Sequence, residues 1–165
     1  AGDCSLATMT LSIAAAAAGF LMFNFPPARV FMGDAGAIPL GFLAAVCGIA
    51  GWQQGDWPMW FGPAVFSPFV VDATLTLLRR LARGARVWEA HREHYYQRLV
   101  QSGLGHRRTL FAEFALMILV SAVALAGLQS APSLQAGAGA AIATLYVVLL
   151  IVFERKLPLA EQHNA

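Results

Sequence analysis

The sequence predicts an all-α fold, that of a polytopic helical membrane protein with about five transmembrane helices. Hydrophobic residues make up 58% of the 165 residues and charged residues only 12%, whereas a typical soluble domain carries about 25% charged residues. Mean hydropathy is +0.61, and the apolar residues gather into five runs close to the length of a membrane-spanning helix. The two isolated cysteines, Cys4 and Cys47, argue against a disulfide framework or a metal knuckle.

The five runs are expected to form one transmembrane domain over residues 1–156, followed by a polar tail at 157–165. The predicted spans are residues 5–23, 37–52, 57–78, 110–129 and 135–153. Short links follow the second and fourth spans, so each is expected to form an antiparallel hairpin with the next. Pro63 and Pro68 are expected to break up or kink the third span.

The distribution of basic residues predicts the orientation of these spans. The long connection 79–109 holds eight of the eleven basic residues, and the positive-inside rule therefore places it in the cytoplasm. Counting spans back from that connection places the segment 24–36 on the same side. The sequence thus predicts two cytoplasmic loops, 24–36 and 79–109, that face one compartment.

Asp34 is the most informative residue of the first loop, because glycines flank it and prolines precede it. A carboxylate in this position is typical of a ligand for a divalent cation such as Mg²⁺, which shares its other positions with water and phosphate. Capping of the second span is an equally supported alternative. One carboxylate does not hold Mg²⁺ tightly by itself. Arg29, in the same loop, is expected to contact either a phosphate or a lipid headgroup.

The second loop contains a histidine motif. His91, His94 and Arg98 are spaced at i, i+3 and i+7, so a helix would place them on one face. Such a face suits a multiply charged phosphate. Zinc binding is weakly supported, because no third ligand lies at a typical spacing. An amphipathic surface helix, with aromatic residues at the headgroup level and arginines against membrane lipid, is the other alternative.

Two further acids lie within or beside the spans. Asp72 is expected to pair with Arg79, seven residues later on the same helical face. The alternative is that Asp72 lines a polar cavity near Asp34. Glu113 is expected near the membrane interface.

Two motifs resemble one membrane family. The first runs from Asn24 to Gly36 and reads Asn-Phe-Pro-Pro-Ala-Arg-Val-Phe-Met-Gly-Asp-Ala-Gly, and the second extends from Pro68 to Leu99 and contains His-Arg-Glu-His. Together they are similar to the polyprenyl-phosphate N-acetylhexosamine-1-phosphate transferases, also grouped as bacterial glycosyltransferase family 4. The second motif resembles most closely the branch that acts in O-antigen and other surface glycan assembly.

The resemblance implies an activity and the groups that support it. A sugar 1-phosphate would pass from a UDP-N-acetylhexosamine-type sugar to undecaprenyl phosphate, with Mg²⁺ as cofactor and release of UMP. The setting would be the cytoplasmic face of the bacterial inner membrane, with no nucleic acid as partner. Asp34 would be the catalytic and metal-binding acid. The expected substrate-binding residues are Asn24, Arg29, His91, Arg92, His94 and Arg98.

Departures from the family pattern lead to further expectations. The family's N-terminal paired aspartates are absent, so the chain is expected to be the C-terminal half of a longer protein and to need the missing half for catalysis. Ala37 stands where the family usually has serine. Two alternatives remain: a non-catalytic membrane remnant or binding module, and a transporter fragment in which Asp72 marks an ion path.

Overall fold

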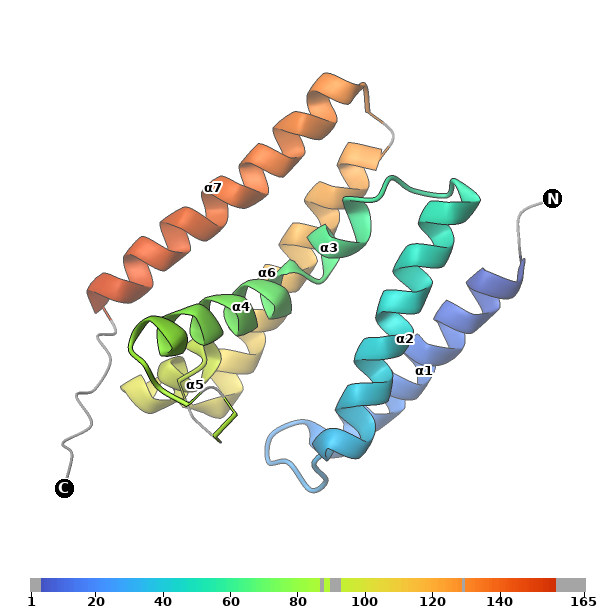
Figure 1. The fold of residues 1–165 in the computed structure, drawn as a ribbon. Coiled ribbons are helices and arrows are strands. Elements are labelled where there is room, and N and C mark those ends of the chain that lie inside the picture. The colour runs from blue at the N-terminus through green and yellow to red at the C-terminus, as the bar shows by residue number, and fades with distance from the viewer. Residues whose placement is uncertain (1–3, 87, 90–92, 129, 157–165) are drawn as a thin grey trace, which may run out of the picture. The chain divides into compact units, whose positions relative to one another are not determined.

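The computed structural model describes residues 4–86, 88–89, 93–128 and 130–156, and every regular element within these ranges is a helix (Figure 1). The chain divides into two compact units, Ala1–Gly62 and Pro63–Ala165. The elements in order are α1 (Cys4–Asn24), α2 (Gly33–Gln54), α3 (Phe61–Val65), α4 (Ser67–Ala82), α5 (Tyr95–Leu99), the π-helical turn η1 (Val100–Leu104), α6 (Gly105–Leu128) and α7 (Pro132–Lys156).

Four helical segments are long and apolar enough to cross a membrane. They are Ser5–Asn24, Gly33–Gln54, Tyr95–Leu128 and Ser133–Lys156. Their apolar side chains are largely exposed on the protein surface, for example Phe42, Ile118 and Val147, as expected where lipid is the solvent. The all-α, multi-pass prediction is therefore confirmed.

The third predicted span is broken into two helices. α3 ends at Val65 and α4 starts at Ser67, with Phe66 between them at φ −88° and ψ 3°. Pro68 lies in the first turn of α4, where its missing N–H costs no intrahelical bond. The expected effect of the prolines is thus observed as a break. Neither helix alone has the length of a span, and a crossing by residues 57–78 stays a prediction.

In the first unit, α1 and α2 form a hairpin, and a tryptophan covers the last turns of α2. α2 ends at Gln54 and is capped by Gly55, whose φ of +80° is in the left-handed region that favours glycine. The chain then folds back, and Trp57 Nε1 donates a hydrogen bond to the carbonyl oxygen of Gly48 at 3.0 Å. The Trp57 ring covers Gly51 so closely that a Cβ on Gly51 would overlap it.

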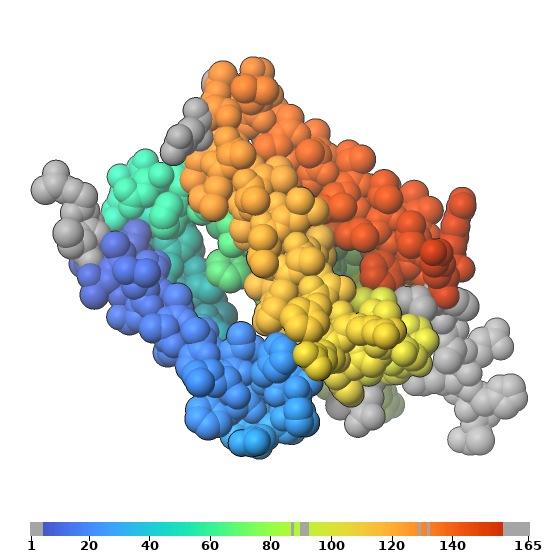
Figure 2. Space-filling view, turned by 180° about the vertical axis from the view of Figure 1, so that it is seen from behind, coloured from blue at the N-terminus to red at the C-terminus, as the bar shows by residue number. Residues whose placement is uncertain are grey.

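The second unit is organised around α6. α6 contacts α4, α5 and η1, and forms a hairpin with α7; the space-filling view shows α6 and α7 against each other near their connected ends (Figure 2). Val120 and Ala124 of α6 are fully buried. A hydrogen bond of 2.8 Å between the hydroxyl groups of Ser67 and Tyr146 connects the start of α4 to α7.

α6 starts five residues earlier than the fourth predicted span. Gly103 and Gly105 have φ values of +94° and +76°, which other residues rarely adopt. These two glycines let the chain turn from η1 directly into α6, so the polar residues His106 to Thr109 form its first turn. Apolar patterning alone does not detect a polar first turn.

We predict that Gly51→Ala destabilises the first unit. Alanine is normally better than glycine in a helix, but here the added methyl group would displace Trp57 at a cost of about 1–3 kcal/mol. The measurement is the apparent melting temperature of the detergent-solubilised protein. Gly19→Ala, where a Cβ meets nothing within 4 Å, is the control. Equal melting temperatures for the two variants would contradict the prediction.

Candidate functional site

Asp34 lies in the first turn of α2, directly after a glycine with a left-handed backbone conformation. Gly33 has φ +59°, so a glycine is required to turn the chain into the helix there. The Asp34 side chain is exposed. Among the residues that the structure describes, no hydrogen bond or ion pair reaches its carboxylate.

The capping alternative for Asp34 is wrong, because Met32 occupies the N-cap position of α2 and makes no side-chain cap bond. A carboxylate in the first turn still interacts favourably with the helix dipole. Since neither the backbone nor a cation of the described chain engages it, the carboxylate is available to a ligand.

Asn24 holds the link between α1 and α2 in place. Its side-chain Nδ2 donates to the carbonyl oxygen of Val30 at 2.9 Å. The backbone N–H groups of Arg29 and Val30 donate to the carbonyl oxygen of Phe23, at 2.9 and 3.3 Å. These bonds shape the segment that delivers Asp34, while the Arg29 side chain remains exposed. Substrate contacts by Asn24 and Arg29 stay predictions.

In the second unit, Asp72 does not pair with Arg79, and that prediction is wrong. The Asp72 carboxylate oxygen Oδ1 accepts hydrogen bonds from the Tyr95 backbone N–H at 2.9 Å and from Thr76 Oγ1 at 3.2 Å. His94 Nδ1 lies 3.4 Å from the same oxygen. Asp72 therefore connects α4 to the start of α5.

Arg79 pairs with Glu154, near the end of α7, at 2.8 Å. Arg98 pairs with the same carboxylate at 3.2 Å, and the Tyr95 hydroxyl donates to it at 3.3 Å. The Tyr95 ring also has both guanidinium groups within cation–π distance, at 4.9 Å and 5.2 Å. Glu154 and Tyr95 thus gather two arginines that are far apart in the sequence.

Of the predicted face of His91, His94 and Arg98, only His94 and Arg98 are among the described residues, and they do not lie on one continuous helical face. His94 is the N-cap of α5, with ψ 148°, so no helix continues through it toward residue 91. Arg98 is only 6% exposed and paired with Glu154, so it serves the packing of α5 rather than an exposed phosphate site. His91 and Arg92 lie outside the described residues.

Glu93, inside the histidine motif, connects this part of the loop to α4. Its carboxylate pairs with Arg80 at 2.6 Å and also with Arg83, and Arg80 Nη2 donates to the carbonyl oxygen of Arg86 at 2.7 Å. Burial raises the pKa of Glu93, but the hydrogen bonds and charges of Arg83 and Arg80 outweigh this and lower the pKa below its ordinary value. Glu93 is therefore charged near neutral pH.

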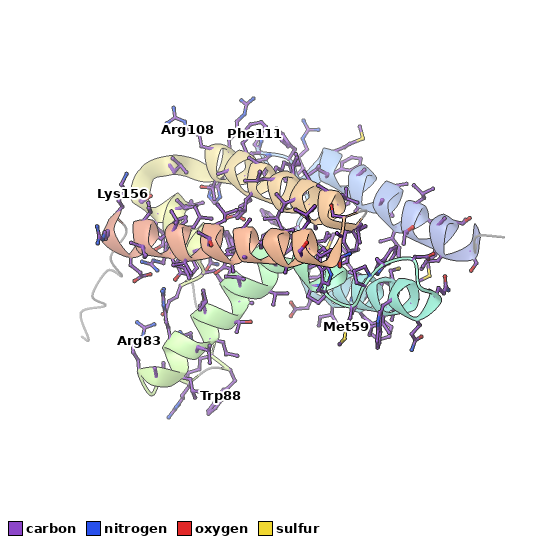
Figure 3. The ribbon with its side chains drawn as sticks, turned by 90° about the horizontal axis from the view of Figure 1, so that it is seen from above. Met59, Arg83, Trp88, Arg108, Phe111 and Lys156 are labelled. Carbon is purple, nitrogen blue, oxygen red and sulfur yellow. The ribbon has the colours of Figure 1, made fainter. Side chains whose placement is uncertain are left out.

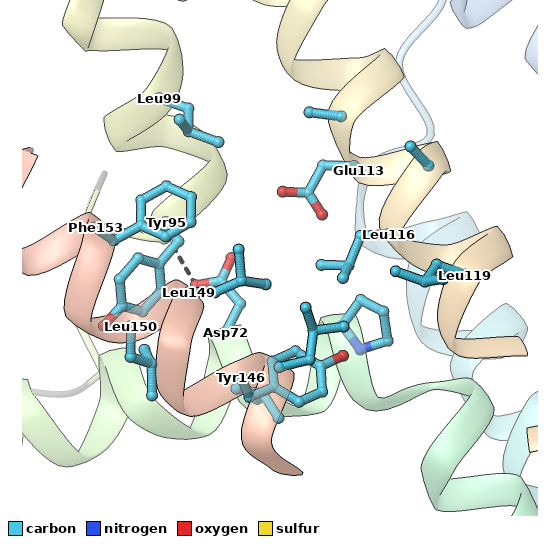
Figure 4. A pocket seen from close by; sticks show the side chains of 15 residues that line it. Asp72, Tyr95, Leu99, Glu113, Leu116, Leu119, Tyr146, Leu149, Leu150 and Phe153 are labelled. Atoms are coloured by element: carbon cyan, nitrogen blue, oxygen red, sulfur yellow. Dashed lines mark hydrogen bonds between the residues drawn. The ribbon is translucent and has the colours of Figure 1, made fainter. Parts of the chain in front are cut away.

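A cavity of about 290 Å³ lies between α4, α5, α6 and α7. Most of its lining residues are apolar, and leucine is the commonest of them, but Asp72, Glu113 and Tyr146 bring polar groups to it (Figure 4). The alternative prediction for Asp72 was that it lines a polar cavity. Asp72 does line this cavity, but most of the other lining residues are apolar. Glu113 was expected near the membrane interface, and the structure places it in the lining of this cavity. The sequence pattern does not predict this, because it does not show which face of α6 packs toward α4 and α7.

The tip of the basic loop fits the surface alternative. Arg83 and Trp88 project together beyond the end of α4 (Figure 3), and Trp88 is 80% exposed. An exposed tryptophan beside arginines is typical of the membrane–water interface. His94 lies further along the chain, against Asp72, and its contact with a phosphate-bearing substrate stays a prediction.

The described residues contain no group of three or more His, Cys, Asp or Glu side chains that could hold a metal ion. Asp34 fits one ligand position of a hard cation such as Mg²⁺, since a free carboxylate is the donor that such a cation prefers. It does not form a complete metal site.

These features define a class of protein: a multi-pass helical membrane protein that presents a free carboxylate and an anchored histidine. Residues 1–52 match the sequence model of glycosyl transferase family 4. The chain belongs to this family.

Curated relatives agree with this assignment. The chain is 26% identical over 161 residues to the probable undecaprenyl-phosphate N-acetylglucosaminyl 1-phosphate transferase of Bacillus subtilis, covering 92% of this chain and 39% of the relative. It is 30% identical over 166 residues to the decaprenyl-phosphate N-acetylglucosaminephosphotransferase of Mycolicibacterium smegmatis, covering 92% and 41%. It is also 30% identical over 135 residues to the phospho-N-acetylmuramoyl-pentapeptide-transferase of Chloroflexus aggregans, covering 74% and 35%.

The chain thus spans about two fifths of the length of these relatives. No solved structure matches it.

We predict that the ion pairs of Glu93 stabilise the loop in a pH-dependent way. Because the folded-state pKa is lowered, their contribution is present above the unfolded pKa of about 4.3 and is lost as pH falls through the folded value. The difference in melting temperature between the wild type and Glu93→Gln should be largest near neutral pH and should close in acid. Glu89→Gln, which breaks an exposed pair with Arg86, should change little at any pH. A gap for Glu93→Gln that persists unchanged at pH 3 would contradict the prediction.

Proposed function

We propose that this chain forms part of a Mg²⁺-dependent transferase that moves a sugar 1-phosphate from a UDP-N-acetylhexosamine to undecaprenyl phosphate and releases UMP. The names of the relatives support this proposal, since they describe transferases that act on undecaprenyl or decaprenyl phosphate. The observation that carries it is the Asp34 carboxylate: it is exposed, unpaired among the described residues, and located in the part that matches the family model.

Asp34 would supply one oxygen ligand to Mg²⁺. Bound Mg²⁺ would neutralise the negative charge of the diphosphate that reacts, as phosphoryl transfer requires. The remaining ligands would come from substrate phosphates and from the portion of the relatives' length that this chain does not span. Asn24 would support this role indirectly, because its bond to Val30 shapes the segment that leads to Asp34.

His94 is the residue of the histidine motif that we assign to the nucleotide sugar. Its imidazole is 27% exposed and its backbone is fixed as the N-cap of α5. Arg98 is engaged by Glu154, so the proposal does not require it to touch substrate. His91, Arg92 and Arg29 would add positive charge for the phosphates.

The reaction would take place at the cytoplasmic face of the bacterial inner membrane, in the assembly of O-antigen or another surface glycan. The arginine-rich connection and the positive-inside rule support this orientation, with α3 and α4 together forming the third crossing. The exposed Trp88 and its neighbouring arginines are consistent with a loop resting on anionic lipid.

We predict that Asp34→Asn lowers the rate of UMP release about 100-fold or more, because removing a group that stabilises charge at an active site has an effect of this size in other enzymes. The substitution is made in the protein as its source cell produces it. The assay supplies UDP-N-acetylglucosamine, undecaprenyl phosphate and Mg²⁺. Asp56→Asn changes an exposed acid just beyond the opposite end of α2 and is the matched control. Normal turnover by Asp34→Asn would remove Asp34 from the site, and an inactive wild type would favour a non-catalytic remnant.

We further predict that His94→Ala lowers kcat/KM about 10- to 100-fold, the effect of losing one hydrogen bond of about 1.5–3 kcal/mol to a charged group. Membrane insertion, followed by membrane fractionation, should not change. His106→Ala, at an exposed histidine in the first turn of α6, should retain activity. Wild-type rates for both variants would favour a purely interfacial role for the loop.

A further inference from the structure

We propose that the cavity between α4, α5, α6 and α7 binds an amphiphilic amine, a molecule with a primary ammonium head and a hydrocarbon chain. The head would lie between the carboxylates of Asp72 and Glu113, and the chain would lie along the apolar wall. All the lining residues belong to the second unit, and Asp34 is not among them. This binding site is therefore independent of the transferase activity proposed above.

Glu113 is an ionisable group without a partner in an apolar segment. It belongs to Tyr95–Leu128, which is long and apolar enough to cross a membrane. No hydrogen bond or ion pair joins its carboxyl group to the residues that the structure describes, and its charge interacts unfavourably with that of Asp72. An acid in such a segment is costly and typically marks a place where a ligand or an ion binds.

Asp72 has one carboxylate oxygen to spare. The two hydrogen bonds that its side chain accepts, from Thr76 Oγ1 and from the Tyr95 N–H, both reach Oδ1, and His94 Nδ1 lies 3.4 Å from the same atom. Within the described part of the chain, Oδ2 receives no hydrogen bond. Figure 4 shows the carboxyl groups of Asp72 and Glu113 directed into the same space.

The hydroxyl group of Tyr146 adds a third acceptor. Ser67 Oγ has one proton and donates it to the carbonyl oxygen of Ala64 at 2.6 Å. The 2.8 Å bond between the Ser67 and Tyr146 hydroxyl groups must therefore use the Tyr146 proton, so the Tyr146 oxygen has only lone pairs to offer a ligand. Tyr95, the other lining residue with a hydroxyl group, donates its proton to Glu154.

These acceptors determine the charge of the ligand head. No lysine, arginine or histidine is among the described residues that line the cavity. A primary ammonium group carries three N–H donors and a positive charge, so it can bond to both carboxylates and to a hydroxyl oxygen. A phosphate or carboxylate head would be repelled by both acids. Charge complementarity thus favours a cationic head.

The rest of the cavity suits a hydrocarbon chain. Its volume of about 290 Å³ is near the lower end of the range for small-molecule sites, which begins at about 300 Å³. Leu116, Leu119 and Leu149 are part of its wall. Leu119 is 49% exposed, so the cavity reaches the surface of a helix that is apolar enough to lie in lipid. An amphiphile would enter from the lipid, with its chain toward Leu119.

The direct test uses dodecylamine that carries a photoreactive diazirine in its chain. The protein as its source cell produces it is purified in detergent and irradiated with this probe, and the labelled peptides are identified by mass spectrometry. We expect saturable labelling of α6 and α7 that excess dodecylamine suppresses and excess dodecanol, which has the same chain without the charge, does not. Equal suppression by dodecanol would show that the cavity does not recognise an ammonium group and would overturn the proposal.

Substitutions locate the binding site. Glu113→Gln keeps the shape of the side chain and should lower the affinity for the probe about 10- to 100-fold, as expected for the loss of a charge-assisted hydrogen bond. Asp56→Asn, at an exposed acid of the first unit, is the matched control and should label like the wild type. Ala115→Phe fills the cavity without changing its charge, should abolish the labelling, and keeps the test decisive if Glu113→Gln does not fold. Unchanged labelling in either cavity variant would overturn the proposal.

A competition experiment distinguishes two sources of the ammonium group. Phosphatidylethanolamine carries a primary ammonium, whereas phosphatidylcholine has a quaternary nitrogen without N–H donors. Suppression of labelling by phosphatidylethanolamine but not by phosphatidylcholine would assign the cavity to a membrane lipid, and suppression by dodecylamine alone would assign it to a single-chain amine. None of these measurements uses transferase activity, so failure of the proposed function and failure of this site give different results.

Discussion

The carboxylate of Asp72 is a charged group placed within an apolar helix, with 19% of its side chain exposed, so it requires hydrogen-bond donors. One donor, Thr76, comes from its own helix, and the other is the backbone N–H of Tyr95, the first residue of α5. Meeting this requirement brings a segment 23 residues away in the sequence back onto α4. This contact positions His94 and also Tyr95, whose ring lies within cation–π distance of Arg79 and Arg98.

The helices and the turn before Asp34 could be predicted from the sequence because their causes are local. Apolar run length defined four of the membrane-spanning segments. Prolines at 63 and 68 predicted the interruption that is found at Phe66. Gly33 is needed for a left-handed backbone position, and two glycines flanking one acid already indicated a special turn. These features require only the nearest neighbours along the chain.

The pairing of charges could not be predicted in the same way. Helical spacing suggested Arg79 for Asp72, but Arg79 is taken by Glu154, which α7 brings from 75 positions further along the chain. Arg98 looked like a phosphate ligand because its spacing suits a helix that would start before His91; the extended backbone of His94 ends that register. Residue type and spacing identify which groups are charged, whereas long-range packing decides which partners they meet.

The contacts made by α7 also impose an order in time. Ser67 and Tyr146 connect one end of α4 to α7, and Glu154 collects Arg79, Arg98 and the Tyr95 hydroxyl at the other end. Because α7 follows α4 and α5 in the sequence, the ribosome synthesises α7 after all the residues that α7 contacts there. During synthesis the two arginines therefore remain without this carboxylate until α7 emerges and docks. The arrangement of Arg79, Tyr95 and Arg98 around Glu154 is therefore completed only after α7 has been made.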